Sequence, residues 1–220
     1  MNEAKKTRGC LITVEGIDGA GKSTQVERLV VLLAERGHLV VGTREPGATA
    51  LGRELRRMVL GRELELARDA ELFLFLADRA EHLATVIKPA LASGAIVLCD
   101  RFMDSTVAYQ GHGRQNDLER VRRWDADSRR GIAPDLTLLL DCPIELGAER
   151  RQRESDRYQA LDREFHERVR RGFLEQAAAE PARIRRIDGS RDLAIVSAEV
   201  AGVTLTWLAE HGFASPQASS

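Results

Sequence analysis

The feature that most constrains the fold of this chain is a glycine-rich stretch near its N-terminus. Residues 16–23 read GIDGAGKS and fit the pattern G-x-x-x-x-G-K-S/T. Residues 11–14, just before it, are apolar and rich in β-branched side chains, which is typical of a buried strand. After it, Val26, Leu29 and Leu33 recur at helical spacing. Strand, glycine loop and helix in this order predict a loop that binds phosphate oxygens.

This loop predicts where a nucleoside triphosphate binds. Its backbone N–H groups would surround the phosphates at the positive end of the following helix. Lys22 would reach the β- and γ-phosphates, and the Ser23 hydroxyl would ligate Mg²⁺, with Asp100 as a second metal ligand. The predicted triphosphate-binding residues are Gly16, Ile17, Asp18, Gly19, Ala20, Gly21, Lys22, Ser23 and Thr24.

Composition limits the class of protein. A chain of 220 residues with 43% hydrophobic residues can form one globular domain, expected over residues 1–212, followed by a frayed tail over 213–220. The net charge of −1 offers no basic field for nucleic acid. We find neither the apolar run of a signal peptide nor an apolar stretch of about 18 residues, so no membrane span is expected. Cys10, Cys99 and Cys142 lack metal-ligand spacing and fit buried positions in a cytoplasmic protein.

Alternating strands and helices define the expected fold class. Continuous apolar runs over residues 11–14, 95–99 and 136–140 predict strands that are buried on both faces, as in a parallel sheet. Shorter runs over 39–43 and 184–187 add two more strands. We therefore predict an α/β, P-loop NTPase-type three-layer fold, with a five-stranded parallel sheet, helices on both faces and ligands at the carboxyl ends of the strands. Helices are expected over residues 24–36, 49–60 (N-cap Thr49), 69–94 (N-cap Asp69, with a break near Pro89), 118–130, 144–152, 161–179 and 193–208.

Charged residues follow two of the expected strands. Arg44 and Glu45 follow the second strand, and Arg101 follows the third. An arginine in such a position can chelate a phosphate with its planar fork. Two arginines predict a second phosphate-bearing ligand beside the triphosphate. The alternative is an Arg–Glu or Arg–Asp pair that binds no ligand.

Aromatic and polar side chains gather near the same sheet edge. Phe75 and Arg79 are four residues apart and share a helix face, where a ring and a guanidinium can bind a base. The alternative is a core phenylalanine and a solvated arginine. Four polar residues after the third strand can line a pocket, unless the segment is only a helix start capped by Asp104 or Ser105. These four are Ser105, Thr106, Tyr109 and Gln110.

The densest charge run lies between residues 149 and 171. Residues 153–157, RESDR, have no apolar periodicity and separate two helices, which predicts an arginine-rich lid over about 149–160. Arg150, Arg153 and Arg157 would stabilise charge during phosphoryl transfer. The alternative is a solvated helix face of paired charges.

Together these stretches resemble thymidylate kinase. The matching residues are 15–25, 43–47, 75–79, 100–102, 105–106, 108–111, 134–136, 140–141 and 156–157. The resemblance implies transfer of a phosphoryl group from ATP, with Mg²⁺, to dTMP on the way to dTTP, in a homodimer. Gly19 and Ala20 leave the loop without an arginine, so the chain is similar to the bacterial type whose lid supplies the arginines. Ala48 replaces a glycine of the family pattern, and Gln159 replaces a frequent glutamate.

The resemblance also implies residue roles. Phe75 would stack on thymine and Arg79 would bond its exocyclic oxygen, with Thr106 and Gln110 near the base. The 3′-hydroxyl would contact Asp18, and the arginines at the strand ends would hold the acceptor phosphate; Tyr109 would lie under the deoxyribose. The implied substrate-binding set is Asp18, Arg44, Glu45, Phe75, Arg79, Arg101, Ser105, Thr106, Tyr109 and Gln110, and the catalytic set is Lys22, Arg101, Arg150, Arg153 and Arg157.

Other functions fit parts of the pattern. One is a kinase of another nucleotide. Another is a deoxynucleoside kinase, which needs a base for its hydroxyl, and Glu15 or Asp100 has the chemistry for that. A regulatory switch would bind a triphosphate and a partner but no acceptor. The Phe75–Arg79 pair and the two strand-end arginines favour an enzyme with a second nucleotide.

Overall fold

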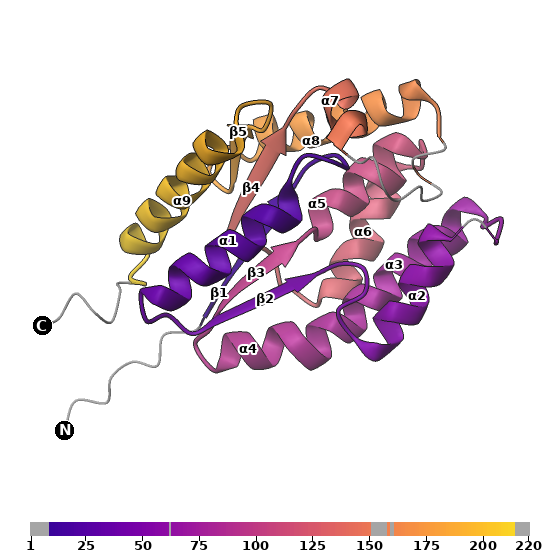
Figure 1. Ribbon diagram of the computed structural model, residues 1–220. Helices are drawn as coiled ribbons and strands as arrows, with labels where there is room; N and C mark the ends of the chain where they lie inside the picture. Colours follow the sequence, from indigo (N-terminus) through magenta and orange to yellow (C-terminus); the bar gives the residue numbers. More distant parts are fainter. Residues whose placement is uncertain (1–8, 62, 151–157, 159–160, 214–220) are drawn as a thin grey trace, which may run out of the picture.

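The computed structural model describes residues 9–61, 63–150, 158 and 161–213. Its parallel sheet has the strand order β2-β3-β1-β4-β5 (Figure 1), which confirms the predicted five-stranded α/β architecture. The strands are β1 (Cys10–Glu15), β2 (Val40–Arg44), β3 (Ile96–Asp100), β4 (Leu136–Asp141) and β5 (Ile184–Asp188).

The three central strands are buried along their whole length. Alternate residues face opposite sides of the sheet. Ile12 and Val14 pack with residues of the helix that follows the glycine loop, whereas Leu11 and Val97 pack in a second cluster with Leu91. Both faces are therefore covered, which explains why these strands are continuous apolar runs.

Helices cover the sheet in two layers. In Figure 1, α1 and α9 lie together over one face, and they also contact each other. Of the crossover helices, α4 packs against β3, and α8 packs against β4 and β5. The helices are α1 (Lys22–Glu35), α2 (Ala50–Leu60), α3 (Arg68–His82), α4 (Lys88–Ala92), α5 (Met103–Thr106), α6 (Leu118–Arg129), α7 (Ile144–Arg150), α8 (Arg163–Ala179) and α9 (Leu193–Glu210), with π-helical segments η1 (Leu83–Ile87) and η2 (Val107–Gly113).

The long helix predicted over 69–94 is interrupted as expected. The π-helical η1 replaces regular α-helix over residues 83–87, directly ahead of α4, whose second residue, Pro89, has a ring nitrogen that cannot donate the normal helical hydrogen bond. The predicted start was wrong, because Ala67 is the N-cap and Asp69 lies in the first turn, where its charge favours the helix N-terminus.

Two other helix starts were also tested. Thr49 caps α2, as predicted, by accepting a bond from the Gly52 N–H at 2.8 Å. Neither Asp104 nor Ser105 caps α5, which starts after Phe102 without a side-chain cap. Asp104 is buried and forms a bidentate pair with Arg183 instead.

The expectation of no long apolar stretch was wrong for α9. Among the described residues, this helix alone is long and apolar enough by composition to cross a bilayer. One side of it, which includes Val196, Val200 and Trp207, is buried in the core of the domain. Cys10, Cys99 and Cys142 are buried free thiols, as expected.

Candidate active site

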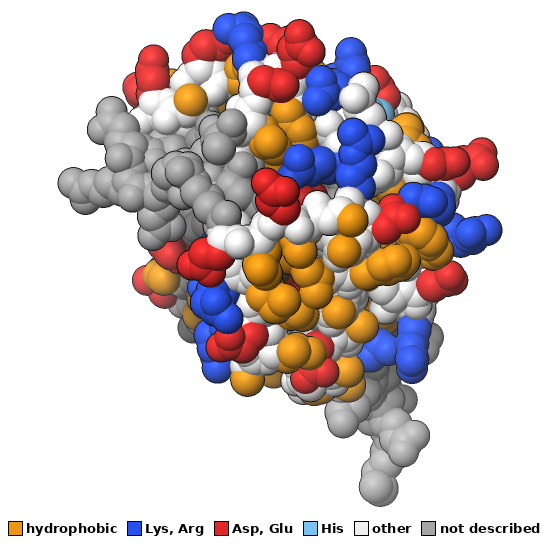
Figure 2. All heavy atoms as spheres, turned by 90° about the vertical axis from the view of Figure 1, so that its right-hand side faces the viewer, with side chains coloured by type: hydrophobic (Ala, Val, Ile, Leu, Met, Phe, Trp, Pro, Cys, Tyr) orange, Lys and Arg blue, Asp and Glu red, His pale blue; other side chains and the backbone are white. Residues whose placement is uncertain are grey.

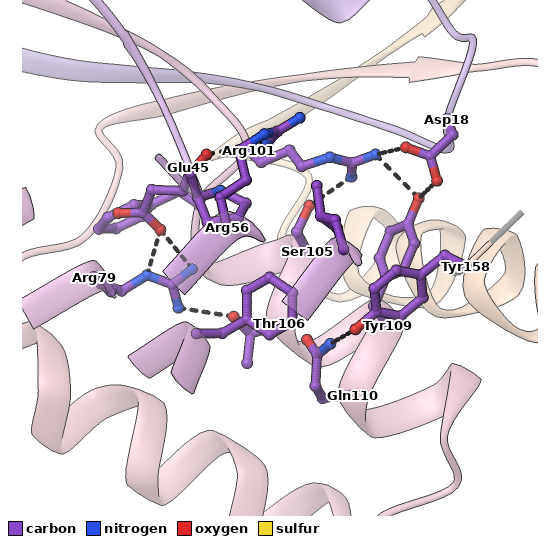
Figure 3. A pocket seen from close by; sticks show the side chains of 14 residues that line it. Asp18, Glu45, Arg56, Arg79, Arg101, Ser105, Thr106, Tyr109, Gln110 and Tyr158 are labelled. Carbon is purple, nitrogen blue, oxygen red and sulfur yellow. Dashed lines mark hydrogen bonds and ion pairs between the residues drawn. The ribbon is translucent and has the colours of Figure 1, made fainter. Parts of the chain in front are cut away.

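Two adjoining cavities lie at the carboxyl ends of the strands. We call the first the inner pocket (Figure 3); it is lined by residues of α2, α3, α5 and η2 and of the segments that follow β1, β2 and β3, and it has a volume of about 90 Å³. The second, the loop cleft, is open and much larger, at about 920 Å³, and follows the glycine loop. Asp18, Glu45, Arg56 and Arg101 line both cavities. The two spaces therefore meet at these four side chains.

Glycines allow the loop to turn into α1. Gly21, the N-cap of α1, has φ 93°, and Gly19 has φ 80°. A Cβ on Gly19 would lie 2.0 Å from the carbonyl oxygen of Gly147, so no side chain fits there. The Lys22 ammonium donates to the Ile17 carbonyl at 2.8 Å, and burial lowers the pKa of Lys22 to about 8.

Ser23 and Asp100 form the predicted metal pair. The Ser23 hydroxyl donates to Asp100 Oδ2 at 2.5 Å. Asp100 Oδ1 is buried and has no hydrogen-bond partner in the part of the chain described. A hydroxyl and a carboxylate with an unused oxygen are the hard donors that Mg²⁺ prefers, and this ion takes its remaining ligands from phosphates and water. The residues present therefore fit a divalent cation bound with ATP.

Arg101 is the hub between the cavities. Its backbone is left-handed, with φ 69°, which directs the side chain along the glycine loop. Its guanidinium donates to the Gly16 carbonyl at 3.1 Å, to Asp18 at 2.5 Å and to the Tyr109 hydroxyl at 3.0 Å. Asp18 in turn accepts a bond from that hydroxyl at 2.8 Å.

Glu15 anchors this unusual turn from below. Its carboxylate accepts bonds from the Phe102 N–H at 2.7 Å and from the Ser105 hydroxyl at 2.6 Å. Ser105 also accepts a bond from Arg101 at 2.9 Å. Burial raises the pKa of Glu15 to about 8. Because Glu15 lines neither cavity, its role is to hold the turn rather than to face a ligand.

Arg79 lies in a buried cluster of charges, so the solvated-surface alternative was wrong. Its guanidinium donates to Glu45 at 2.8 Å, to the Thr106 hydroxyl at 2.8 Å, and to Asp125 of α6. Arg79, Glu45 and Asp125 are 2%, 5% and 2% exposed. The other oxygen of Glu45 accepts a bond from His82 Nδ1, 2.9 Å away. The cluster fixes the guanidinium at the wall of the inner pocket (Figure 3).

Aromatic rings form the opposite wall. Phe75 is half-buried and its ring centroid lies 6.4 Å from that of Tyr158, whose ring meets Tyr109 edge to face at 5.7 Å. The Gln110 amide donates to the Tyr158 hydroxyl at 3.1 Å. The wall thus combines apolar ring surface with one amide, which suits a planar ligand with polar edges.

Nine of the ten predicted substrate-binding residues meet in the inner pocket: Asp18, Glu45, Phe75, Arg79, Arg101, Ser105, Thr106, Tyr109 and Gln110. Arg44 does not; it is exposed and lines the loop cleft. Successive residues of a strand point to opposite sides, so Glu45 turns inward and Arg44 outward.

The predicted triphosphate-binding residues from Asp18 to Thr24 line the loop cleft. Gly16 and Ile17 do not line it; their carbonyl oxygens accept bonds from Arg101 and Lys22. Arg150 lines the cleft and donates to the Gly189 carbonyl at 2.8 Å, whereas Arg153 and Arg157 lie outside the described residues.

Sequence reasoning did not assign several lining residues to the site, among them Leu60, Arg56 and Tyr158. Arg56 of α2 lines both cavities, but its position among the arginines of RELRR gave no signal to separate it from its neighbours. Tyr158 lies within the predicted lid segment, directly after residues 153–157, which have no apolar periodicity, so nothing local pointed to the pocket.

Comparison with known proteins agrees with this geometry. The sequence model of the family described as thymidylate kinase matches residues 14–200. The chain is 52% identical to the thymidylate kinase of Desulfovibrio desulfuricans over 190 residues, covering 82% of this chain and 88% of the relative. It is 45% identical to that of Geobacter sulfurreducens, covering 90% and 97%. The crystal structure of thymidylate kinase from Ehrlichia chaffeensis superposes with a TM-score of 0.75 at 36% identity, covering 90% of this chain and 99% of that one. The chain therefore belongs to the thymidylate kinase family.

Proposed function

We propose that the chain transfers the γ-phosphoryl group of ATP to the 5′-phosphate of dTMP, with ATP in the loop cleft and dTMP in the inner pocket. The observation that carries this proposal is the meeting of the two cavities at Arg101, where Asp18, Glu45 and Arg56 also line both spaces. An acceptor phosphate at this junction faces the end of a triphosphate that lies along the glycine loop. Phosphoryl transfer depends mainly on such positioning and on charge neutralisation.

On the donor side, backbone N–H groups of the loop and Lys22 hold the phosphates, and Mg²⁺ supplies charge neutralisation when bound. Ser23 and Asp100, which has an unpartnered carboxylate oxygen among the described residues, would hold the ion. Arg150 and the lid arginines Arg153 and Arg157 share the transferring charge, by resemblance to the bacterial members whose loops also lack arginine. The support for Arg150 is its place in the loop cleft.

On the acceptor side, Arg101 and Arg56 hold the phosphate, and Arg44 contributes from the loop cleft. Phe75 and Tyr109 cover the base and the deoxyribose, and Asp18 takes the 3′-hydroxyl. Ser105, Thr106, Glu45 and Gln110 complete the polar lining, and Arg79 faces the exocyclic oxygen of thymine.

A phosphate acceptor needs no general base, because it is already an anion. This distinguishes the proposal from a nucleoside kinase. Glu15 is fully buried and already accepts bonds from Phe102 and Ser105, so it is not available to take a proton from a ligand hydroxyl. Asp100 is occupied with Ser23 in the loop cleft rather than in the inner pocket.

We also propose that the chain acts as a homodimer in the cytoplasm, where its buried thiols stay reduced. Figure 2 looks onto the side that carries α2, α3 and α6, and hydrophobic side chains gather in the middle of that face. Leu51 of α2 and Phe73 of α3 are 48% and 49% exposed, and Phe73 packs on Trp124 of α6 with 4.7 Å between ring centroids. Such a patch across three helices is typical of a protein interface. A second copy of the chain is the partner we propose.

A coupled assay of ADP release across a panel of nucleoside and deoxynucleoside monophosphates, with free deoxynucleosides included, tests the function. We expect dTMP to give the highest kcat/KM and thymidine to give no turnover. Turnover of thymidine without dTMP turnover would establish a nucleoside kinase. ATP hydrolysis that no monophosphate stimulates would establish a switch. Light scattering on the purified chain and on Phe73→Arg tests the dimer: wild type should have twice the monomer mass, and the variant should not.

A further inference from the structure

Glu71 is a buried acid that the proposed reaction leaves without a task. It lies on α3, one helical turn before Phe75, and is 1% exposed. Arg114, which follows η2, binds it with both ends of its guanidinium, through Nε at 3.1 Å and Nη2 at 2.8 Å. Because the acid is paired with a fixed positive charge, it is a carboxylate, and a carboxylate only accepts hydrogen bonds.

The Gln110 amide contacts this carboxylate. Its Nε2 lies 3.2 Å from Glu71 Oε1 and 3.1 Å from the Tyr158 hydroxyl. The amide oxygen cannot face a carboxylate without repulsion, so Glu71 decides which end of the amide turns toward α3. Figure 3 shows the nitrogen of Gln110 directed at Tyr158 and the oxygen turned away from it.

The oxygen of Gln110 is therefore the atom left for a ligand. Within the described ranges, both hydrogen bonds of this side chain run through Nε2. Gln110 lines the inner pocket and is itself 2% exposed, so its amide has little freedom to rotate. A fixed acceptor in a buried pocket favours a ligand with a donor at that place and rejects one with a second acceptor.

We propose that Glu71 is a positioning residue that locks Gln110 with its oxygen toward the base, and that this lock selects a pyrimidine carrying N3–H. Thymine and uracil have that hydrogen; cytosine has a bare acceptor at N3. The inference rests on the proposed function, since it assigns the base to the inner pocket. It adds to that function a source of selectivity that does not touch the substrate.

The test is Glu71→Gln, which keeps the shape of the side chain but adds an NH₂ group. That group can donate to the Gln110 oxygen, so Gln110 can turn its own nitrogen toward the base. The substrates are dTMP and 5-methyl-dCMP, which share the 5-methyl group and differ only at N3 and C4. We expect the ratio of kcat/KM for dTMP over 5-methyl-dCMP to fall at least about tenfold, while the KM for ATP stays within about twofold.

Two variants separate positioning from structural support. Arg114→Lys removes the two-point contact of the guanidinium but keeps a cation beside Glu71, which stays a carboxylate that only accepts, so the substrate ratio should stay within about threefold of wild type even if stability falls. Glu119→Gln makes the same chemical change on the exposed face of α6 and should have no effect on the ratio. If Arg114→Lys lowers the ratio as much as Glu71→Gln does, Glu71 acts only through the geometry of the ion pair and the proposal is wrong.

A wild-type measurement keeps the idea testable if Glu71→Gln does not fold. Calorimetry should show the 3-deaza analogue of dTMP, with C–H in place of N3–H, binding at least about tenfold more weakly than dTMP. Equal affinity of the two ligands would overturn the inference, and so would an unchanged substrate ratio in a folded Glu71→Gln enzyme. In both cases dTMP turnover by the wild type would leave the proposed function intact. If the wild type did not turn over dTMP, the proposed function itself would be wrong.

Discussion

The inner pocket and the loop cleft treat charge in opposite ways. Around the inner pocket, charged side chains are paired with each other before any ligand binds: the lining residues Arg79 and Glu45 together with Asp125 behind them, and Glu71 with Arg114 behind Gln110. In the loop cleft, Arg101 pairs with Asp18, but the charges closest to the glycine loop are not neutralised in this way. The Lys22 ammonium donates to a neutral backbone carbonyl, and Asp100 keeps a buried oxygen unpartnered in the described part of the chain.

This difference indicates that the inner pocket is formed before a ligand binds, whereas the charges of the loop cleft are balanced only when a ligand is bound. A cluster of paired, buried charges holds its side chains in place during folding, so it can present fixed donors and acceptors to a base. Unpaired charges around the glycine loop are costly until phosphates and a metal ion arrive, and then they act where charge develops. We therefore expect substitutions in the inner pocket to lower stability as well as binding, and substitutions in the loop cleft to lower activity alone.

The largest effect should come from breaking the buried cluster. Arg79→Met keeps much of the apolar volume but leaves Glu45 and Asp125 buried without their cation. Removing one partner of a buried ion pair costs about 3–5 kcal/mol. Chemical denaturation should show a loss of this size in the free energy of unfolding. The exposed Arg68→Met, at the start of the same helix, should change it by less than about 0.5 kcal/mol. A stable Arg79→Met protein would mean that the pocket is not held by its charges.

Lys22→Ala should give the converse result. The lost charge acts on the transferring phosphoryl group, so we expect kcat to fall at least about 100-fold. Burial already lowers the pKa of Lys22 to about 8, so the fold gains little from the ammonium, and the free energy of unfolding should change by less than about 1 kcal/mol. Thymidylate affinity, measured by calorimetry, should stay within about threefold. A variant that retains wild-type kcat would refute the role of Lys22.

The same pKa gives a pH dependence with a defined sign. In the free enzyme the ammonium loses its proton as pH rises through about 8. The kcat/KM for ATP of the wild type should therefore fall above that pH, because a neutral amine attracts the triphosphate less. The kcat at saturating ATP should be less sensitive, since bound phosphates stabilise the charged form.

The two regions also differ in how far the sequence predicted them. The loop cleft depends on a local pattern: glycines, Lys22 and Ser23 lie within one turn and one helix start, so the motif was sufficient. The inner pocket depends on contacts between distant segments. Asp125 is 46 residues from Arg79 and comes from another helix, and no spacing rule connects them. Tyr158 and Glu71 were missed for the same reason.

Arg44 shows what an expectation based on strand ends leaves undetermined. The sheet brings both strand ends to one edge, as predicted, but the side-chain direction at each end depends on register. Arg44 and Glu45 are neighbours on opposite sides of the chain, and it is Glu45 that lines the inner pocket. Only the three-dimensional path of β2 and its loop decides between them.

A smaller effect is expected for the lid arginines. Arg150→Ala, Arg153→Ala and Arg157→Ala should each lower kcat at least about tenfold, a change in barrier of about 1.4 kcal/mol, because several arginines share the charge. The KM for dTMP should change by less than about twofold, since the inner pocket is formed without them. Lysine at each position should restore only part of the rate, because it lacks the planar fork. Wild-type kcat in all three alanine variants would remove the lid from the mechanism.

The smallest effect concerns Asp78, where burial of the carboxyl group lowers the stability of the folded state once the group is ionised. This residue is 1% exposed; its Oδ1 accepts a bond from the Gly47 N–H at 3.1 Å, whereas Oδ2 is buried without a partner among the described residues. Burial first, and then the charge of Glu45, raises the pKa of Asp78 to about 6, although Arg79 and His82 oppose this shift. The folded state therefore holds a proton that the unfolded state releases at lower pH.

The sign of the resulting pH dependence follows from linkage. A raised acid pKa contributes stability that is complete below the unfolded value near 3.8 and is lost as pH rises through about 6. Asp78→Asn has no ionisable group at this position, so its stability has no such contribution to lose as pH rises. The free energy of unfolding of this variant, measured relative to wild type, should rise by at least about 1 kcal/mol between pH 4.5 and pH 8. The exposed Asp127→Asn should show no such trend. Any pH-independent effect of the new amide group is the same at pH 4.5 and at pH 8. It therefore cancels when only the change in stability with pH is compared. A flat difference would mean that Asp78 stays ionised at low cost, and that the wall of the inner pocket is more hydrated than its burial indicates.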